Sequence, residues 1–444
     1  MGGPQRVDGV CEGVRLSAVV ELLRELIRAE TVNPPGNETR AAEVLRAYLE
    51  DAGVEVELIA KVPERANLVA RIRGNGSGPA LALLSHTDTV LADPAEWQRD
   101  PWSGEVVDGE IWGRGALDMK GQVAASAVAI ASLAREGFRP GGDLVFIAAA
   151  DEEVGEDFGL SWLVREHPDA VRADYAINEG GGDRVVLGGR PLYLCATAEK
   201  MTAPFRLRVH GRSGHASMPS IADNALVKAA RIVEQLAAYR PRLRHLPETE
   251  ALLEAILGEV PPVEEAAARV EAVHPMARTL VEPLLSLTFA PTMVEASKKR
   301  NVIPALCELV VDSRLQPGQT PEDAREELRA AIGEDGYEYE LIEAIGGTGS
   351  SMETPLWDAV AAFIAEEEPG AVVAPVGCAG FTDSHWMRDA FGTVAYGFFP
   401  MRAMDAEVAA LLVHSADERA HVDDLELGVR WLRFAAQRMG ALSA

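Results

Sequence analysis

The chain has 444 residues, 48% of them apolar, and carries a formal net charge of −27 at pH 7. Its length and apolar content favour two or three domains with a sizeable buried core. The negative charge argues against a nucleic acid or an anionic membrane as partner, because both require a basic surface, and it leaves small molecules or proteins.

The first half of the chain alternates helical and strand-like patterns. Apolar residues at helical spacing predict helices over 16–29, 39–53 and 121–135. Short apolar runs predict strands at 54–59, 67–72, 80–85, 143–150 and 173–178. Strands that alternate with helices at this spacing indicate an α/β fold with a mixed, largely parallel sheet covered on both faces.

From about residue 200 the predicted order changes to strand, helix, strand, strand, helix, strand, which is typical of a ferredoxin-like α+β unit. An acidic helical stretch at about 241–283 interrupts this unit as an insertion. After Gly346 and Gly347 the earlier pattern resumes. We therefore expect a large domain formed by 1–199 and 346–444, with a smaller domain, 200–345, inserted into it.

The sequence also bears on the compartment. No apolar run approaches the roughly 18 residues that span a bilayer, and the N-terminal MGGPQRVDGVCEGVRL lacks the pattern of a signal peptide. We therefore expect a cytoplasmic protein. The four cysteines, Cys11, Cys195, Cys307 and Cys378, lie far apart with no CxxC pair and are predicted to be free thiols, mostly buried.

Metal-ligating side chains follow the predicted strands of the large domain. The segments that carry them supply His86 and Asp88, Asp118, Glu152 and Glu153, and Glu179, and His414 near the C-terminus adds an imidazole. Ligands of open α/β sheets collect outside the carboxyl ends of the strands, so these residues can converge on one crevice. In the segment FIAAADEEVG three adjacent carboxylates follow a predicted buried strand. They repel one another and lose hydration there, so they require a compensating cation or hydrogen-bond donor.

Two readings of these residues stand side by side. The acids can form a solvated loop, and HTD at 86–88 can be an ordinary turn. Alternatively, two histidines with carboxylates suit zinc, and a bridging aspartate can hold two ions roughly 3.5–4 Å apart. Asp88 lies two residues from His86 and can accept the second ring N–H of a metal-bound histidine.

The motifs HTDTV, GRGALDMKG, DEEVG, NEGG, GHASMP, NVIP and DSRLQPG, followed by the terminal His414, resemble the dinuclear-zinc aminoacylase and carboxypeptidase family. That family includes acetylornithine deacetylase, succinyl-diaminopimelate desuccinylase and bacterial glutamate carboxypeptidase. The resemblance implies two divalent ions, expected to be zinc with cobalt or manganese as alternatives. It implies the following roles: His86 and Glu179 as terminal ligands, Glu153 and His414 completing the sites, Asp118 bridging, Asp88 orienting His86, and Glu152 as general base.

The resemblance extends to the smaller domain, which it implies is a lid and often the dimerisation surface, so that a homodimer is expected. His215 in GHASMP resembles the histidine that polarises the scissile carbonyl, commonly across a dimer interface, and Arg314 resembles an arginine that grips a substrate carboxylate. Asn301 and Gly380 are weaker matches as substrate-binding residues. The chain departs from the pattern at His385, where many relatives carry arginine, and in the insertion at 241–283.

Together these observations predict a metal-dependent hydrolase that cleaves an amide bond next to a free carboxylate, in an N-acyl amino acid, a dipeptide or a C-terminal residue. A carbamoyl-amino-acid amidohydrolase is the alternative enzyme class. A binding relative without activity would be marked by a lost ligand or base, and every such position is filled here. A nucleotide-binding enzyme has little support, since WGRGALDMKG is not G-x-G-x-x-G and no Walker-type GK[ST] is present.

Overall fold

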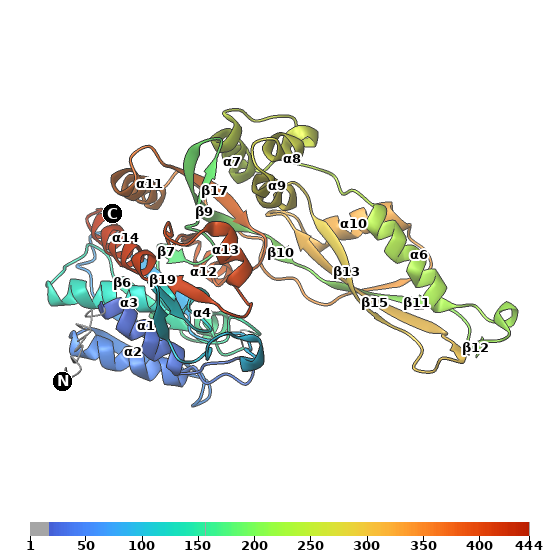
Figure 1. Cartoon of the computed structure of the whole chain (residues 1–444), viewed down its shortest axis with the longest axis horizontal. Coiled ribbons are helices and arrows are strands. Elements are labelled where there is room, and N and C mark those ends of the chain that lie inside the picture. Colours follow the sequence, from blue (N-terminus) through green and yellow to red (C-terminus); the bar gives the residue numbers. More distant parts are fainter. Residues whose placement is uncertain (1–16, 156, 444) are drawn as a thin grey trace, which may run out of the picture.

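The computed structural model describes residues 17–155 and 157–443 and shows a larger α/β body from which a narrower body extends (Figure 1). The expectations about Cys11 and about an N-terminal signal peptide fall on residues 1–16 and lie outside the described part. The other three cysteines are free thiols, as predicted, with Cys195 and Cys307 buried. Among the described helices, none is both long enough and apolar enough to cross a membrane.

The larger body is built on a mixed, nine-stranded sheet. Eight of its strands follow the order β1-β2-β6-β3-β7-β18-β9-β17, and β8 pairs with β9. The pairs β3–β6, β3–β7, β7–β18 and β9–β17 are parallel, whereas β1–β2, β2–β6, β8–β9 and β9–β18 are antiparallel. The strands are β1 (Glu55–Ala60), β2 (Ala66–Ile72), β3 (Leu81–His86), β6 (Leu144–Ala149), β7 (Tyr175–Asn178), β8 (Arg184–Leu187), β9 (Arg190–Glu199), β17 (Val372–Cys378) and β18 (Val394–Gly397).

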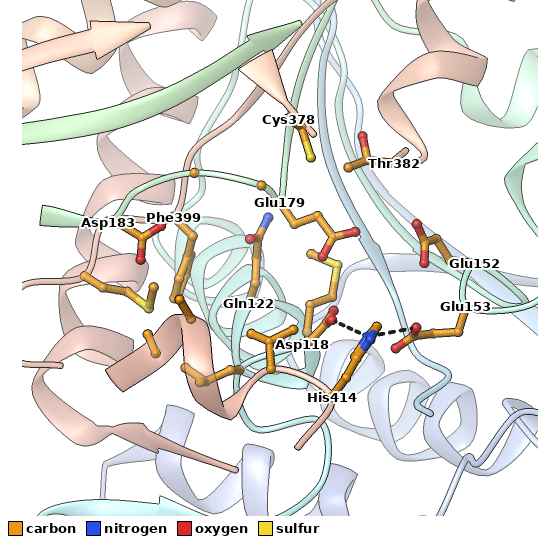
Figure 2. A pocket seen from close by; sticks show the side chains of 18 of the residues that line it. Asp118, Gln122, Glu152, Glu153, Glu179, Asp183, Cys378, Thr382, Phe399 and His414 are labelled. Atoms are coloured by element: carbon orange, nitrogen blue, oxygen red, sulfur yellow. Dashed lines mark ion pairs between the residues drawn. The ribbon is translucent and has the colours of Figure 1, made fainter. Parts of the chain in front are cut away.

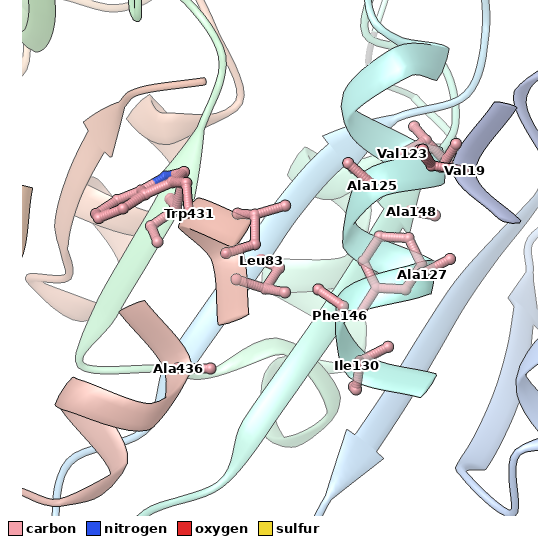
Figure 3. Packing of buried hydrophobic residues seen from close by; sticks show 14 of the residues in the cluster. Val19, Leu83, Val123, Ala125, Ala127, Ile130, Phe146, Ala148, Trp431 and Ala436 are labelled. Atoms are coloured by element: carbon pink, nitrogen blue, oxygen red, sulfur yellow. The ribbon is translucent and has the colours of Figure 1, made fainter. Parts of the chain in front are cut away.

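Helices cover both faces of this sheet, because β3 and β6 are buried along their whole length and need apolar cover on each side. One face packs against α1 (Ala18–Arg28), α2 (Thr39–Asp51), α3 (Lys120–Arg135), α11 (Pro355–Glu367) and α14 (Val422–Gly440). Figure 3 shows part of this core, where alanines of α3 let the helix lie close to Phe146 of β6. The other face packs against α4 (Leu160–Glu166), α5 (Pro168–Val171) and α12 (Ser384–Phe391).

The narrower body has the predicted ferredoxin-like organisation. Its elements are β11 (Phe205–His210), α6 (Ala225–Ala238), β13 (Thr288–Glu295), β15 (Leu306–Leu315), α10 (Pro321–Ile332) and β16 (Glu338–Leu341), with a short β10 (Met201–Thr202) also paired to β15. The four main strands lie antiparallel in the order β13-β15-β11-β16. Both helices contribute to the core with the apolar side of the sheet. A separate two-stranded ribbon, β12 (Gly214–His215) and β14 (Val302–Ile303), lies at the tip farthest from the larger body (Figure 1).

The helical insertion packs differently from our expectation. Its helices α7 (Pro247–Leu257), α8 (Val263–Glu271) and α9 (Pro275–Val281) share a core with β8, β9 and β17 of the large sheet. The reason is that Leu192 and Leu194 of β9 point away from the α11 and α14 side and would otherwise be exposed. The insertion therefore belongs in sequence to 200–345 but packs on the larger body (Figure 1).

A three-stranded sheet of β4 (Glu105–Val107), β5 (Glu110–Trp112) and β19 (Arg419–His421) joins segments far apart in the sequence. Helix α13 (Ala406–Leu412) precedes β19, and short 3₁₀ turns occupy Pro94–Glu96, Pro219–Ile221 and Glu282–Leu284. Because β19 pairs with β5, the segment that carries His414 is held beside the loop that carries Asp118.

Candidate metal centre

Three neighbouring parallel strands bring most of the candidate ligands to one edge of the sheet. Strand β3 lies between β6 and β7, and its last residue is His86. Glu152 and Glu153 come shortly after the end of β6, and Glu179 comes directly after β7. Asp151 has a positive φ of 63°, so the chain turns sharply between β6 and the two glutamates.

Asp118 lies between two imidazoles. Its Oδ1 is 3.2 Å from Nε2 of His86, and its Oδ2 is 3.0 Å from Nε2 of His414. The residue belongs to the loop between β5 and α3, and its peptide bond to Met119 is cis. One carboxylate therefore faces both histidines, each with a different oxygen.

Each imidazole has a second carboxylate within reach. Oε1 of Glu179 lies 3.6 Å from Nε2 of His86. Oε2 of Glu153 lies 3.1 Å from Nε2 of His414, as Figure 2 shows. Ligand atoms of His86, Asp118 and Glu153, and likewise of His86, Glu152 and Glu179, all lie within 4.8 Å of one another. The arrangement thus contains two sets, His86 with Glu179 and His414 with Glu153, which share Asp118.

The residues present fit a pair of divalent cations. Oε1 of Glu153 is buried and has no hydrogen-bond partner within the described part of the chain, so one carboxylate oxygen of the cluster is left without a donor. Imidazole nitrogen and carboxylate oxygen are ligands that zinc accepts at roughly 2.0–2.2 Å, which places neighbouring ligands of a tetrahedral ion about 3.3 Å apart. The ligand separations observed here are close to that value.

Electrostatics at the centre also indicate missing positive charge. Burial raises the pKa of Glu179 to about 7, and the neighbouring Asp118 adds to the rise. Hydrogen bonds with Asp118 and then Glu153 raise the pKa of His414 to about 10. Burial alone would raise the pKa of Asp118, but its hydrogen bonds with His414 and His86 hold it well below the usual value. The carboxylates around the two imidazoles thus favour positive charge at this centre.

Glu152 differs from Glu153 in its surroundings. Its Oε2 lies 4.0 Å from Nε2 of His86, and no histidine in the described part of the chain approaches it as closely as His414 approaches Glu153. Burial raises the pKa of the Glu152 carboxyl well above its usual range, and the carboxylates of Glu179 and Glu153 add to the effect, against His86. Such an environment makes the carboxylate a stronger proton acceptor than a solvated glutamate.

Asp88 is fully buried and contacts both sides of the centre. Nδ1 of His86 lies 3.2 Å from its backbone oxygen and 3.5 Å from its carboxylate Oδ1. The carboxylate also accepts hydrogen bonds from the backbone N–H groups of Glu152 and Glu153, at 3.2 and 3.1 Å. Asp88 therefore contacts the second ring nitrogen of His86 and at the same time holds the turn that carries both glutamates.

A cavity of about 400 Å³ opens onto these residues. One end is lined by Asp118, Glu152, Glu153, Glu179 and His414. Around the rest of the wall are the residues Leu117, Met119, Gln122, Gly180, Gly181, Asp183, Cys378, Phe381, Thr382, Phe399, Met401, Ala409, Ala410 and Val413. The volume suits a small organic molecule.

Comparison with known proteins agrees with this geometry. Residues 82–438 match the model of peptidase family M20/M25/M40. The chain belongs to this family. It is 30% identical over 426 residues to succinyl-diaminopimelate desuccinylase of Methylobacterium nodulans, covering 91% of this chain and 92% of the relative, and 28% identical over 425 residues to the desuccinylase of Cereibacter sphaeroides, covering 92% and 95%.

The fold is also that of known family members. The M20 family metallo-carboxypeptidase Sso-CP2 of Sulfolobus solfataricus superposes with a TM-score of 0.74 at 20% identity, covering 96% of this chain and 100% of the other. The predicted α/β architecture with a separate smaller sheet domain is thereby confirmed, as is the resemblance to this family of metallohydrolases.

The four family-implied residues for substrate contact do not line the cavity. His215 and Asn301 are exposed and lie together at the tip, where the backbone N–H of Ala216 donates to the Asn301 oxygen at 3.0 Å. Arg314 lies at the other end of the narrow body, next to β10, and its guanidinium donates to both oxygens of Asp312 at 3.0 and 3.1 Å. Gly380 lies between the cavity-lining Cys378 and Phe381 without itself lining the wall. Within one chain, the structure therefore does not bring these residues to the ligand cluster.

His385 is on α12 and half-buried, with Nδ1 3.3 Å from Oγ1 of Thr348. Arg388, one turn further along α12, is buried and donates to the backbone oxygen of Ala395 at 2.6 Å. A buried arginine thus lies one turn after His385, but its guanidinium is bonded to the backbone of the same chain.

Several residues that hold the centre escaped the sequence reasoning. Asp151, the first of the three adjacent acids, is paired with Arg65 at 2.7 Å and accepts from Asn33 at 2.8 Å. Its counterion is therefore an arginine directly before β2, far away in the sequence, and nothing in the sequence near 151 indicates it. Glu418, whose carboxylate accepts from the backbone N–H groups of Leu117 and Asp118, could have been noticed as an acid four residues after His414.

Proposed function

We propose that this M20 family protein hydrolyses an amide bond next to a free carboxylate, in an N-acyl amino acid, a dipeptide or the C-terminal residue of a peptide, with two zinc ions as cofactors. The observation that carries the proposal is the position of Asp118, whose two oxygens face His86 at 3.2 Å and His414 at 3.0 Å. A carboxylate in this position is suited to bridge two ions.

His86, Glu179 and Asp118 would hold one ion, and His414, Glu153 and Asp118 the other. When bound, such a pair supplies activation of a water molecule and polarisation of the scissile carbonyl. Glu152, buried beside both sets, accepts the proton of the attacking water and delivers it to the nitrogen of the leaving amine. The raised pKa of Glu152 supports this assignment, because burial beside other carboxylates makes the group a better proton acceptor than a solvated glutamate.

Substrate contacts from the smaller domain complete the proposal. Arg314 lies near the connection between the two bodies, where a rotation can bring it to the cavity, and its planar fork suits a carboxylate. In this structure that fork is bonded to Asp312, so a substrate carboxylate would compete with Asp312.

His215 is proposed to act in a dimer, since the tip of its own chain lies far from the cavity (Figure 1). The smaller domain offers a surface for such a dimer. Strand β13 is an edge strand with Met293 and Val294 exposed, and α6 exposes Leu226 and Val227. An exposed apolar edge strand of this kind is a common site of strand pairing between chains.

The proposal is tested by assaying the protein after metal removal and after loading with zinc, cobalt or manganese. N-acyl amino acids, free dipeptides, N-acyl dipeptides and N-carbamoyl amino acids serve as substrates, and each is paired with its carboxamide. We expect metal-dependent release of the free amino acid from a substrate that keeps its carboxylate. Release of ammonia and carbon dioxide from the carbamoyl substrates alone would favour the carbamoyl hydrolase instead. No hydrolysis with any metal would overturn the proposal.

A further inference from the structure

The cavity has a second end that none of the proposed ligands occupies. Asp183 lies there, on the far side of Glu179 from Glu152 and Glu153, with Phe399 beside it (Figure 2). Its position follows from the backbone, since Asp183 forms a bridge with Met401 and its own carbonyl accepts from Leu194 at 3.0 Å. The carboxyl group is therefore fixed at one wall of the cavity.

The carboxylate of Asp183 has no counterion in the part of the chain that the structure describes, and no other described residue donates a hydrogen bond to it. The arginines nearest in sequence to the wall are engaged elsewhere. Arg184 forms a bidentate pair with Glu368, and Arg402 faces Glu367 at 3.4 Å. Asp424, a like charge that raises the pKa of Asp183, is itself satisfied by backbone N–H groups, one of them from Met404 at 2.8 Å.

Burial raises the pKa of Asp183 to about 6, and the negative charge of Asp424 contributes to the rise. With this pKa the carboxyl group is mostly charged at pH 7, and its own backbone N–H, which lowers the pKa, is the one donor that faces it within the described residues. A cation placed next to it would relieve this penalty, because an opposite charge at short distance favours the charged form of a buried acid.

The wall between Asp183 and the ligand cluster is largely apolar. Phe399, Met401, Ala409 and Val413 form much of it, and no arginine or lysine is among the residues that line the cavity. This combination of an apolar wall with one anion at its end suits a short hydrocarbon chain that ends in a positively charged donor group.

We propose that Asp183 binds a primary ammonium group at the end of an apolar chain of the substrate. The inference rests on the proposed amide hydrolysis and adds the chemical class that the cavity selects: a substrate with a terminal amine on the part that enters the cavity. Acyl or amino-acid parts of the same length without the amine would be bound less tightly, because they leave the Asp183 charge unpaired.

Calorimetry on the metal-loaded protein tests the binding step without requiring turnover. The probes are ω-amino acids from 3-aminopropanoate to 6-aminohexanoate, each compared with the fatty acid of the same length. We expect one chain length to bind about 10- to 100-fold more tightly than its deaminated partner, as a charge-assisted hydrogen bond implies. Because binding is measured directly, this result is independent of whether the protein hydrolyses any amide.

Two variants assign the effect to Asp183. Asp183→Asn should abolish the advantage of the amine, and Asp183→Glu should keep it with the preferred chain shorter by about one methylene. Asp335→Asn makes the same change at an exposed aspartate of the smaller domain and should leave the advantage intact. No amine advantage at any length, or an advantage that survives in Asp183→Asn, would overturn the inference.

Discussion

Glu418 holds the backbone of Asp118: its Oε1 accepts hydrogen bonds from the N–H of Asp118 at 3.1 Å and of Leu117 at 2.8 Å. Its other oxygen accepts from Gly115 N–H and from Arg114. Glu418 itself is fully buried. The carboxylate thus fixes the loop that carries the proposed bridging ligand, from a position four residues after His414.

Replacement of Glu418 by glutamine therefore has a defined consequence. An amide has one acceptor oxygen in place of two, so at least one pair of buried N–H donors loses its partner, at about 1–3 kcal/mol for each. We expect a lower melting temperature and a weaker hold on both metals. Glu407→Gln, at an exposed position of α13, is the matched control. Metal content and stability like those of the parent would mean that the loop is held in another way.

Metal binding should depend on pH. Burial alone would lower the pKa of His86, but the surrounding carboxylates raise it above its usual value, and hydrogen bonds with Asp118 and Glu153 raise the pKa of His414 to about 10. In metal-free protein the imidazoles therefore hold their protons more strongly than free histidines do. Each must lose its proton to ligate, so metal uptake releases protons and the affinity falls as the pH is lowered. Elemental analysis should give two divalent ions per chain at pH 8, and titration in buffers of different ionisation enthalpy should detect the protons. Fewer than one ion per chain after loading would contradict the assignment.

Without metal, the stability of the fold should decrease as the pH rises, whereas metal affinity increases with pH. The folded-state pKa of His414, about 10, is raised above the usual 6.5, so its ion pairs stabilise the fold fully below pH 6.5 and are lost as the pH rises through about 10. We expect the melting temperature of metal-free parent protein to fall more between pH 7 and 10 than that of His414→Gln. Parallel curves for the two proteins would show that these ion pairs do not form.

Glu152 and Glu153 should have separable roles. Glu152→Gln keeps the shape but cannot take a proton, so both metals should remain while kcat falls by about two to four orders of magnitude. Glu153→Gln should lose at least one metal and recover only partly at high zinc or cobalt, because Glu153 lies 3.1 Å from His414. Metal content and single-turnover rates, measured for each variant, distinguish a role in proton transfer from a role in metal binding. If both variants lost metal equally, this division of roles would be wrong.

Arg314→Ala tests carboxylate recognition. The variant should have a higher KM, or a kcat/KM lowered by the factor that corresponds to about 1–3 kcal/mol of lost charge-assisted hydrogen bonding. Its metal content should be unchanged. Arg314→Lys keeps the charge without the fork and should recover only part of the loss, and Arg325→Ala, at an exposed position of α10, should behave as the parent. If the parent protein hydrolysed a substrate and its carboxamide equally well, the substrate carboxylate would not be recognised.

The dimer can be tested by complementation. His215→Ala and Glu152→Gln should each be nearly inactive, but if His215 acts in the partner's site, mixing and re-assembly should restore up to about a quarter of parent activity. Mixing two preparations of the same variant is the control. Light scattering gives the mass of the active species. A fully active monomer, or no recovery on mixing, would place His215 outside the partner's site.

The sequence supported the fold and the ligand cluster for physical reasons. His86 and Glu179 end buried apolar strands, and parallel strands align their carboxyl ends, so their convergence follows from local patterns. Arg65 and Asn33 could not be foreseen, because their contacts to Asp151 join segments that no periodicity relates. Asp183 follows the glycines after Glu179 and looks like an ordinary loop acid until its wall of the cavity is seen.

The insertion also falls outside what local patterns predict. A helical pattern near 241–283 shows that helices form but not which sheet they cover. Their partners, Leu192 and Val376, lie on strands far away on either side in the sequence. Only the unsatisfied apolar face of β9 and β17 determines where the helices pack.

Because α7–α9 pack on the larger body while α6 and β13 belong to the smaller one, the polypeptide passes between the two bodies not only at β9–β10 and after β16 but also before α7 and after α9. A domain joined by two adjacent linkers can rotate about them as about a hinge. Two additional linkers at other places limit the angle of that rotation. Loops 239–246 and 285–287 thus act as tethers on the smaller body. We expect the length of these loops, as much as that of the linkers near 200 and 345, to set how far the smaller body can move relative to the larger one.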